Sequence, residues 1–364
     1  MIHVANPTFG EAEQAAVADV LDSGMVADGP EVRTFEAEFA EYCGSDHAVA
    51  TANGTAALVA ALEALELGDG DRVVTTPFSF VASSNAIRLV GAEPVFADVD
   101  PETYNLDPEA TRRAVRAVNA DAILAVHLYG LPADVAALRD VARTEDVRLV
   151  EDAAQAHGAE YRGESVGTFG DAAAFSFYPT KNMTTGEGGM VLTDREAVAE
   201  RAASYVNHGR TADDSPYAHE RVGHNLRMTS LAAAIGRVQL ERLPEWIQSR
   251  RENAERLSTG LADVPGITPP VEPEGRRHAY HQYTIRCENR DRLREHLEAA
   301  GVGTGVYYPA PIHQLGAYED YDADVPAAER AAGSVLSLPV HPGLSADEVD
   351  HVLESVRSAA PQVQ

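Results

Sequence analysis

The sequence predicts an α/β protein with a large domain around a mostly parallel sheet and a smaller C-terminal α/β domain. Residues 45–240 alternate short apolar runs with amphipathic helical stretches, which is typical of a parallel sheet buried on both faces. The pattern changes after a proline-containing loop at 265–270. A hydrophobic content of 45% argues for a packed core in spite of the net charge of −28. We therefore expect a large domain at 1–244, with its N-terminal segment packed on a small domain at 245–364.

Six apolar runs predict strands of the large sheet. They lie at 73–77, 93–97, 122–126, 148–151, 172–176 and 189–193. A long helix is expected from 231 to about 257. Pro244 predicts a break or kink in that helix, because proline lacks a backbone N–H and clashes with the preceding turn.

The small domain is expected to contain two strands and two helices. The strands are predicted at 282–287 and 302–308, and a helix at 291–300 is ended by a glycine. The closing helix at 345–359 has Ser345 in the N-cap position and Glu348 in the capping-box position.

The composition excludes some classes of partner. With 57 acidic against 29 basic residues, the surface repels nucleic acid and anionic membranes. We find no signal peptide and no apolar run long enough to cross a bilayer, so a cytoplasmic location is expected. The scarcity of lysine and the excess of carboxylates indicate a halophilic protein, since in molar salt the Debye length is about 3 Å and like charges hardly repel.

Lys181 is the only lysine in 364 residues, and the other basic residues are all arginine. Arginine cannot replace lysine where a neutral amine must form, because the guanidinium stays protonated. Schiff-base formation is the chemistry that needs such an amine. The alternative is that one lysine remained by chance, and the neighbouring residues have to decide.

Asp152 follows the buried run at 148–151, which places a carboxylate at the carboxyl end of a parallel strand, where ligands of open α/β sheets bind. It could cap a following helix. It could also keep the pyridine nitrogen of pyridoxal phosphate (PLP) protonated, which makes that ring an electron sink. The next run, 172–176, leads to Lys181. A carboxylate and an amine at two strand ends are what a PLP Schiff base requires.

The phosphate of PLP needs an anion-binding site. Residues 52–58 open an alanine-rich helix whose N-terminal amides and dipole favour an anion, and Thr55 adds a hydroxyl. As an isolated motif this could be only a capped helix. Ser176 could donate a second hydroxyl, and Phe80 could either cover the cofactor ring or belong to the core.

Five ordered motifs resemble those of the DegT–StrS family. They are Gly-Thr-Ala-Ala-Leu at 54–58, Val-His-Leu-Tyr-Gly at 126–130, Glu-Asp-Ala-Ala-Gln-Ala-His-Gly-Ala at 151–159, Phe-Ser-Phe-Tyr-Pro-Thr-Lys-Asn at 175–182 with Gly-Glu-Gly-Gly at 186–189, and Gly-His-Asn-Leu-Arg-Met at 223–228. The resemblance covers nearly the whole chain. It implies a PLP-dependent aminotransferase of fold type I that acts on nucleotide-linked keto sugars.

The resemblance also implies a role for individual residues. Lys181 resembles the lysine that bonds covalently to the cofactor, and Asp152 its pyridinium partner. Gln155 resembles the residue that contacts the phenolic oxygen, and Phe80 the aromatic that stacks on the ring. The phosphate cradle corresponds to Gly54, Thr55 and Ser176. Asn225 resembles a residue that reaches the phosphate in the neighbouring subunit, which implies a homodimer with shared active sites.

Tyr308 and His313 align with a segment that lines the sugar site in the resembled family. That family commonly has His-Tyr where this chain has Tyr307-Tyr308, which affects substrate contacts and not the chemistry. No metal is expected, and we assign structural roles to His157 and His208.

The expected reaction transfers an amino group from an amino acid, by resemblance L-glutamate, to a ketone of a nucleotide-linked sugar. An inositol-type ketone is a further substrate class that the sequence leaves open. A PLP-dependent sugar dehydratase is one alternative, but such relatives have a histidine in place of Lys181. A catalytically silent sensor or assembly subunit is another, and the intact Lys181, Asp152 and Thr55 argue against it.

Overall fold

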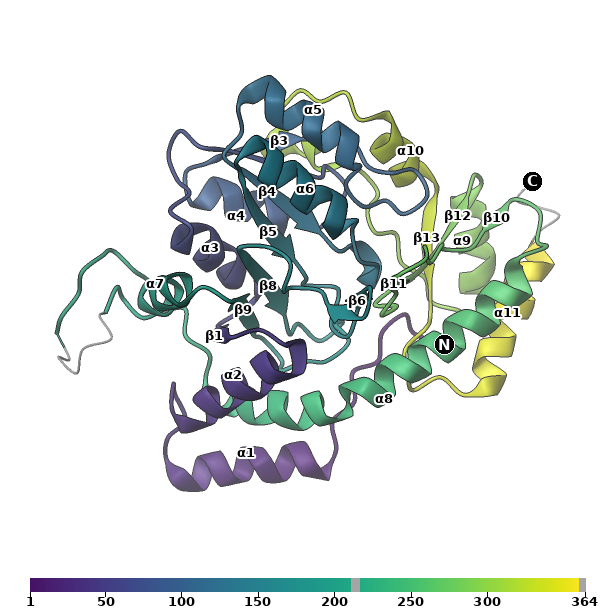
Figure 1. The fold of residues 1–364 in the computed structure, drawn as a ribbon. Helices are drawn as coiled ribbons and strands as arrows, with labels where there is room; N and C mark the ends of the chain where they lie inside the picture. The colour runs from purple at the N-terminus through teal and green to yellow at the C-terminus, as the bar shows by residue number, and fades with distance from the viewer. Residues whose placement is uncertain (211–216, 360–364) are drawn as a thin grey trace.

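A computed structural model of the chain describes residues 1–210 and 217–359. A seven-stranded sheet forms its centre, in the order β1-β9-β8-β5-β4-β2-β3 (Figure 1). Neighbouring strands from β8 to β3 are parallel, whereas β9 runs antiparallel to both of its neighbours. All six predicted strands are present, and the sheet is mostly parallel as expected. The strands are β1 His47–Thr51, β2 Arg72–Thr75, β3 Glu93–Phe96, β4 Ala122–Val126, β5 Arg148–Asp152, β8 Ala172–Ser176 and β9 Gly189–Thr193.

Helices cover both faces of this sheet. One face packs on α3 Gly54–Ala64, α4 Ala82–Leu89 and α7 Glu196–Val206. The other face packs on α2 Pro30–Cys43, α5 Pro108–Val118, α6 Val135–Glu145 and the first half of α8 Ser230–Leu261, with α1 Glu11–Ser23 outside α8. Alternate strand residues face opposite layers, so both sets are apolar. This burial explains why the strands appear in the sequence as continuous apolar runs.

The long helix α8 runs from the large sheet to the C-terminal part of the molecule (Figure 1). A break at Pro244 is wrong, because one helix continues through it, whereas the alternative of a kink stays a prediction. Leu243 and Ile247, on either side of the proline, are fully buried, and this packing maintains the helix. The division of the chain at residues 244 and 245 stays a prediction.

The C-terminal part contains a second, antiparallel sheet in the order β10-β12-β13. Its elements are β10 Ile267–Thr268, β12 Tyr283–Cys287, α9 Arg290–Ala299, α10 Pro326–Ser334, β13 Val335–Leu338 and α11 Ala346–Ala359. The capping box of α11 is confirmed, since the Ser345 amide donates to Glu348 Oε2 at 2.9 Å and the Glu348 amide to Ser345 Oγ at 3.2 Å.

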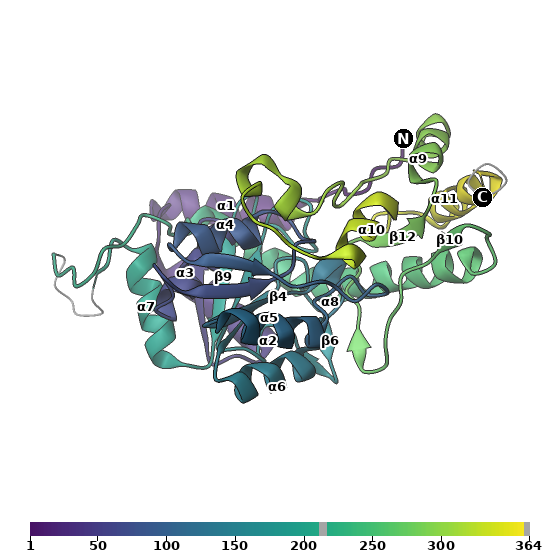
Figure 2. The ribbon, with the colours of Figure 1, turned by 90° about the horizontal axis from the view of Figure 1, so that it is seen from above.

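The predicted strand at 302–308 is wrong. Val302 forms an isolated parallel bridge with Ile2, and Gly305 an isolated antiparallel bridge with Ser337. Because these partners belong to different segments and run in opposite directions, no continuous ladder forms between them. The bridge to Ile2, with its amide donating to the Gly301 carbonyl at 2.8 Å, also places the first residues of the chain beside the C-terminal part (Figure 2).

A small sheet and three short 3-10 helices complete the described structure. The sheet has the order β11-β6-β7 and brings a segment of the C-terminal half next to the large sheet. These elements are β6 Glu160–Tyr161, β7 Glu164–Ser165, β11 Arg276–Arg277, η1 Leu128–Gly130, η2 Ile312–Gln314 and η3 Gly316–Tyr318. None of the helices in the described ranges combines the length and apolar character that a membrane span requires.

Candidate active site

A cavity of about 1150 Å³ opens at the carboxyl ends of β2, β5 and β8 and at the first turn of α3. Ligands of open α/β sheets bind at such an edge. The C-terminal part contributes the opposite wall through residues 281–282 and 307–308. All of the predicted site residues except Asn225 and His313 line this one cavity: Gly54, Thr55, Phe80, Asp152, Gln155, Ser176, Lys181 and Tyr308.

Lys181 is half-buried and lines the cavity. Burial lowers the pKa of Lys181 from its usual 10.5 to about 8, and the nearby Asp152 carboxylate opposes this shift. A solvated lysine would be almost entirely protonated near neutral pH. Lys181 therefore has a much larger fraction of neutral, nucleophilic amine than a lysine at the surface.

Asp152 is the last residue of β5 and is almost completely buried. Its Oδ2 accepts a hydrogen bond from Ser83 Oγ at 2.6 Å, and its Oδ1 accepts one from the Ala154 amide at 3.1 Å. No helix follows β5 before β6, both of which lie in described ranges, so the helix-cap interpretation of Asp152 is wrong. The carboxylate is instead held at the cavity wall.

The first turn of α3 presents to the cavity the kinds of groups that bind anions. Asn53 caps the helix, since its Oδ1 accepts from the Ala56 amide at 2.9 Å. Gly54 and Thr55, the first two residues of the helix, line the cavity together with Ser176. A Cβ on Gly54 would lie 2.6 Å from the Ser176 Cβ, so only glycine lets the helix end approach Ser176 this closely. Amides, a helix dipole and two hydroxyls fit a phosphate group.

Gln155 and Tyr308 meet between the two parts of the molecule. The Tyr129 amide donates to Gln155 Oε1 at 2.8 Å, and Gln155 Nε2 donates to the Tyr308 hydroxyl at 3.4 Å. Burial, together with the negative charge of Asp152, raises the pKa of Tyr308, so this hydroxyl stays protonated. Phe80 is 56% exposed and its ring centroid lies 6.2 Å from that of Tyr308, so Phe80 does not belong to the core.

Asn225 and His313 lie elsewhere. Asn225 is exposed, and its backbone forms an isolated bridge with Asn207 in the segment between α7 and α8. The His313 Nε2 lies 3.5 Å from Glu329 Oε1, and its ring packs 6.2 Å from that of Phe96. Their predicted roles therefore stay predictions that this cavity alone does not support.

His157 is one histidine whose ring lies near the charges of Lys181 and Arg250. His157 is fully buried among aromatic rings, and burial, with the charges of Lys181 and Arg250, lowers its pKa to about 3. It is therefore neutral. Within residues 1–210 and 217–359, no three His, Cys, Asp or Glu side chains lie close enough together to hold a metal ion.

Sequence reasoning missed several residues of the cavity wall, among them Ser83, His281 and Gln282. Ser83 lies three residues after Phe80, at the start of α4. Because residues three apart in a helical turn lie on the same face, this spacing could have placed Ser83 on the cavity side together with Phe80. His281 and Gln282 precede β12 and reach the cavity through contacts with a distant part of the chain, for which the sequence carries no local signal.

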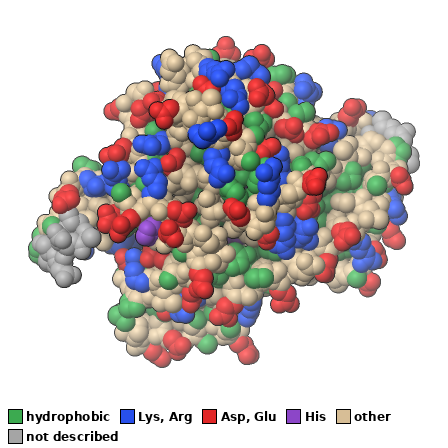
Figure 3. All heavy atoms as spheres, in the orientation of Figure 1, with side chains coloured by type: hydrophobic (Ala, Val, Ile, Leu, Met, Phe, Trp, Pro, Cys, Tyr) green, Lys and Arg blue, Asp and Glu red, His purple; other side chains and the backbone are tan. Residues whose placement is uncertain are grey.

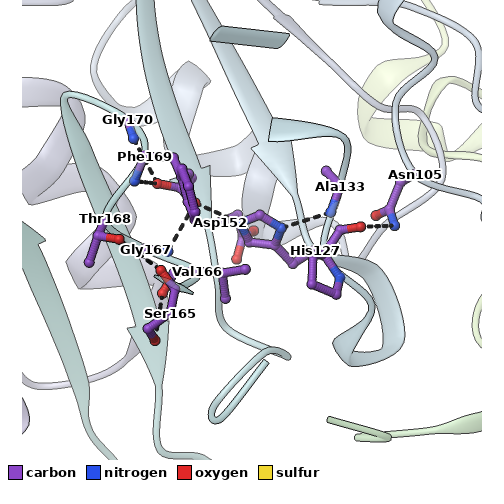
Figure 4. Close-up of polar contacts among 12 residues, drawn as sticks. Asn105, His127, Ala133, Asp152, Ser165, Val166, Gly167, Thr168, Phe169 and Gly170 are labelled. Atoms are coloured by element: carbon purple, nitrogen blue, oxygen red, sulfur yellow. Dashed lines mark hydrogen bonds and ion pairs between the residues drawn. The ribbon is translucent and has the colours of Figure 1, made fainter. Parts of the chain in front are cut away.

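Glu151, next to Asp152, is hydrogen-bonded by the protein's own groups. Figure 4 shows the labelled groups around it, His127 on one side and the loop at 167–170 on the other. The Glu151 side chain accepts from His127 Nε2 at 2.9 Å and from the amides of Gly167, Phe169 and Gly170 at 2.8 to 2.9 Å. The Ala133 amide donates to His127 Nδ1, so the ring hydrogen is on Nε2. Burial by itself raises the pKa of Glu151, but the His127 and amide hydrogen bonds outweigh it and hold that pKa below its usual value.

Comparison with known proteins identifies the class of protein that this fold and site define. The model of the DegT/DnrJ/EryC1/StrS aminotransferase family matches residues 7–357. The chain is 44% identical to the erythromycin biosynthesis sensory transduction protein EryC1 of Saccharopolyspora erythraea, over 94% of this chain and 93% of that protein. It is 42% identical to a dTDP-3-amino-3,4,6-trideoxy-alpha-D-glucose transaminase of Streptomyces venezuelae, over 96% and 92% of the two chains.

A solved structure of S. venezuelae DesV in complex with a ketimine intermediate superposes with a TM-score of 0.93 at 42% identity, covering 97% of this chain and 95% of that one. Fold and sequence agree over almost the full length. The chain belongs to the DegT/DnrJ/EryC1/StrS aminotransferase family, and its fold is that of the PLP-dependent aminotransferases.

Proposed function

We propose that the protein is a PLP-dependent aminotransferase that transfers an amino group from an amino acid to the keto group of a nucleotide-linked sugar. The observation that carries the proposal is that one cavity brings together the only lysine, a buried carboxylate and groups of the kinds that bind anions. Relatives named as transaminases of dTDP-linked and UDP-linked sugars support this substrate class. The cavity volume lies slightly above the range of about 300 to 1,000 Å³ for small-molecule sites, which suits a bulky nucleotide-linked substrate.

When bound, PLP supplies an electron sink for breaking the bond between hydrogen and the carbon next to the amine. Lys181 would hold the cofactor covalently, and its neutral amine would move the proton at the donor Cα. Asp152 would hold a proton at the pyridine nitrogen. Gln155 would contact the phenolic oxygen, and Phe80 would cover the ring. Gly54, Thr55 and Ser176 would bind the phosphate.

Tyr308 is proposed to orient the substrate beside the cofactor. Its hydroxyl stays protonated and is fixed by Gln155. His313 is proposed as a contact of the sugar or nucleotide farther out. The donor is L-glutamate by resemblance to the family.

The test is a transamination assay with the purified protein, PLP, a panel of amino acids and nucleotide-linked keto sugars. We expect an aminated sugar to form with one donor preferred, and none to form with Lys181→Ala. The relative EryC1 is named a sensory transduction protein, so the assay also separates an enzyme from a silent sensor. A protein that binds PLP but transaminates no donor would support the sensor and contradict the proposal.

The protein is further proposed to act as a homodimer in which Asn225 reaches the partner's cofactor phosphate. The described residues between α7 and α8 extend away from the central sheet, and Tyr217 and Val222 in this segment are strongly exposed (Figures 1 and 2). Mixing Lys181→Ala with Asn225→Ala protein under exchange should place both lesions in one composite site. Activity should then recover towards half of the wild-type value. Without complementation after verified exchange, Asn225 belongs to its own subunit's site or to none.

The protein is also proposed to work in a cytoplasm of high salt. Carboxylates are spread over the visible face with arginines between them, and the chain carries a net charge of −28 (Figure 3). Activity and cofactor content should fall together when KCl drops below about 1 M, because screening of self-repulsion is lost. Sucrose, which favours compact states without screening, should rescue little. Equal activity in dilute and molar salt would contradict a halophilic adaptation.

A further inference from the structure

Ser83 is the only side chain among the described residues that donates a hydrogen bond to the Asp152 carboxylate. Its Oγ lies 2.6 Å from Asp152 Oδ2, a short distance that is typical of a hydroxyl bonded to a charged oxygen. Ser83 is the second residue of α4 and is 1% exposed, so water does not compete for this contact.

The carboxylate of Asp152 is the nearest hydrogen-bond acceptor for the single hydroxyl hydrogen of Ser83. Its other neighbours are Ser79 Oγ at 3.2 Å and the Phe80 carbonyl at 3.3 Å, both more distant than Asp152. With the hydrogen directed at the carboxylate, Ser83 can accept from Ser79. The result is a chain of hydroxyls that runs from Ser79 through Ser83 to Asp152.

Two donors fix the plane of the carboxylate. The Ala154 amide binds Oδ1 and Ser83 binds Oδ2, on the two different oxygens of Asp152. A carboxylate can accept about four hydrogen bonds, so capacity remains towards the cavity. A hydrogen bond to the ionised form of an acid favours that form.

We propose that Ser83 is a positioning residue that keeps Asp152 ionised and oriented, so that the shared proton stays on the cofactor's pyridine nitrogen and not on the carboxylate. This inference rests on the proposed function. Without the hydroxyl, Asp152 has one donor fewer to stabilise its negative charge and competes better for the proton. The cofactor ring then loses part of its electron-withdrawing power.

The chain offers a matched control in the next residue. Ser84 is on the same helix and is fully buried, and its Oγ has no hydrogen-bond partner among the described residues. Ser83→Ala and Ser84→Ala thus remove the same atom from neighbouring buried positions, and only the first touches Asp152.

The experiment loads each protein with PLP labelled with ¹⁵N in the ring and records the ¹⁵N resonance of the pyridine nitrogen. In wild type and Ser84→Ala, the resonance should lie at the chemical shift of a protonated pyridine nitrogen. In Ser83→Ala it should move towards the chemical shift of the unprotonated nitrogen, and in Asp152→Asn it should move farther in the same direction. The kcat of Ser83→Ala should fall roughly 10- to 100-fold, the scale of one hydrogen bond to a charged group, with a smaller change in KM.

If the resonance of Ser83→Ala stays at the wild-type chemical shift while that of Asp152→Asn is displaced, the role of Ser83 is overturned and the proposed function stays intact. An undisplaced resonance in Asp152→Asn overturns the pyridine assignment of Asp152 itself. Should Ser83→Ala fail to fold, Ser83→Cys keeps the shape with a weaker donor and must shift the resonance in the same direction. Failure of that variant to shift also overturns the inference.

Discussion

Two neighbouring carboxylates at the end of β5 have opposite surroundings. Glu151 and Asp152 face different sides of the sheet, because successive side chains of a strand alternate. Glu151 is saturated by His127 and three loop amides, and it is fully buried. Among the described residues Asp152 has two donors, and it lines the cavity.

The difference indicates how the acid that we propose to be functional is distinguished from a structural one. Both residues are buried acids in the same strand, so neither residue type nor burial distinguishes them. What distinguishes the two residues is the number of hydrogen bonds that each carboxylate can still accept. Glu151 uses its capacity to hold the 167–170 loop against β5, whereas Asp152 retains acceptor capacity for a group in the cavity.

The largest effect is expected from Asp152→Asn. The variant should keep PLP bound but lower kcat by about 10³-fold, or ~4 kcal/mol of barrier, because a neutral amide cannot hold the pyridine proton as an ion pair does. Steady-state kinetics with the cofactor spectrum recorded alongside measure both effects. Turnover near the wild-type rate would reduce Asp152 to a structural residue.

Glu151→Gln makes the same chemical change one residue earlier and should act on stability instead. An amide in place of the carboxylate removes the charge that His127 and the loop amides share, and its own N–H group would point at other donors. We expect a loss of about 3 kcal/mol in the free energy of unfolding, measured in denaturant. The kcat of the folded fraction should stay within a few-fold of wild type. A large loss of kcat with unchanged stability would reverse the assignment of the two acids.

A smaller effect concerns the pH at which Lys181 captures the cofactor. Since the pKa of Lys181 is lowered to about 8 and only the neutral amine attacks, the rate of PLP attachment to the apoprotein should rise with pH, reach half of its maximum near that value and level off above it. The negative charge of Asp152 raises the pKa of Lys181, so Asp152→Asn should move the midpoint to lower pH. Stopped-flow absorbance measures both proteins. A midpoint near 10.5 would mean that the amine is solvated.

The sequence predicts the strands and the two central residues because their signals are local. An apolar run ending in a polar residue indicates both a buried strand and a side chain at its carboxyl end, which located Asp152 correctly. Lys181 is identified because it is the only lysine in the sequence. The contacts of Ser83 with Asp152 and of Gln155 with Tyr308 join residues 69 and 153 positions apart, and no local pattern encodes them.

The same limit explains the wrong predictions in the C-terminal half. The apolar stretch at 302–308 has the composition of a strand, but its two ends pair with different segments. The neighbours of β12 are β10 and β13, and β13 places Ser337 opposite Thr284 with their hydroxyls 2.8 Å apart. The roles of Asn225 and His313 rest on resemblance alone, since neither side chain lines the cavity.

The central claim is that Lys181 holds the cofactor, and one labelling measurement tests it directly. Borohydride reduces the bond between an amine and PLP and makes the attachment permanent. Because the chain has one lysine, only Lys181 and the N-terminal amine can carry the label. We predict a yellow protein whose absorption band disappears on reduction, a single labelled peptide containing Lys181, and no band in Lys181→Ala. A label at the N-terminus, or an unchanged band in Lys181→Ala, would contradict the account.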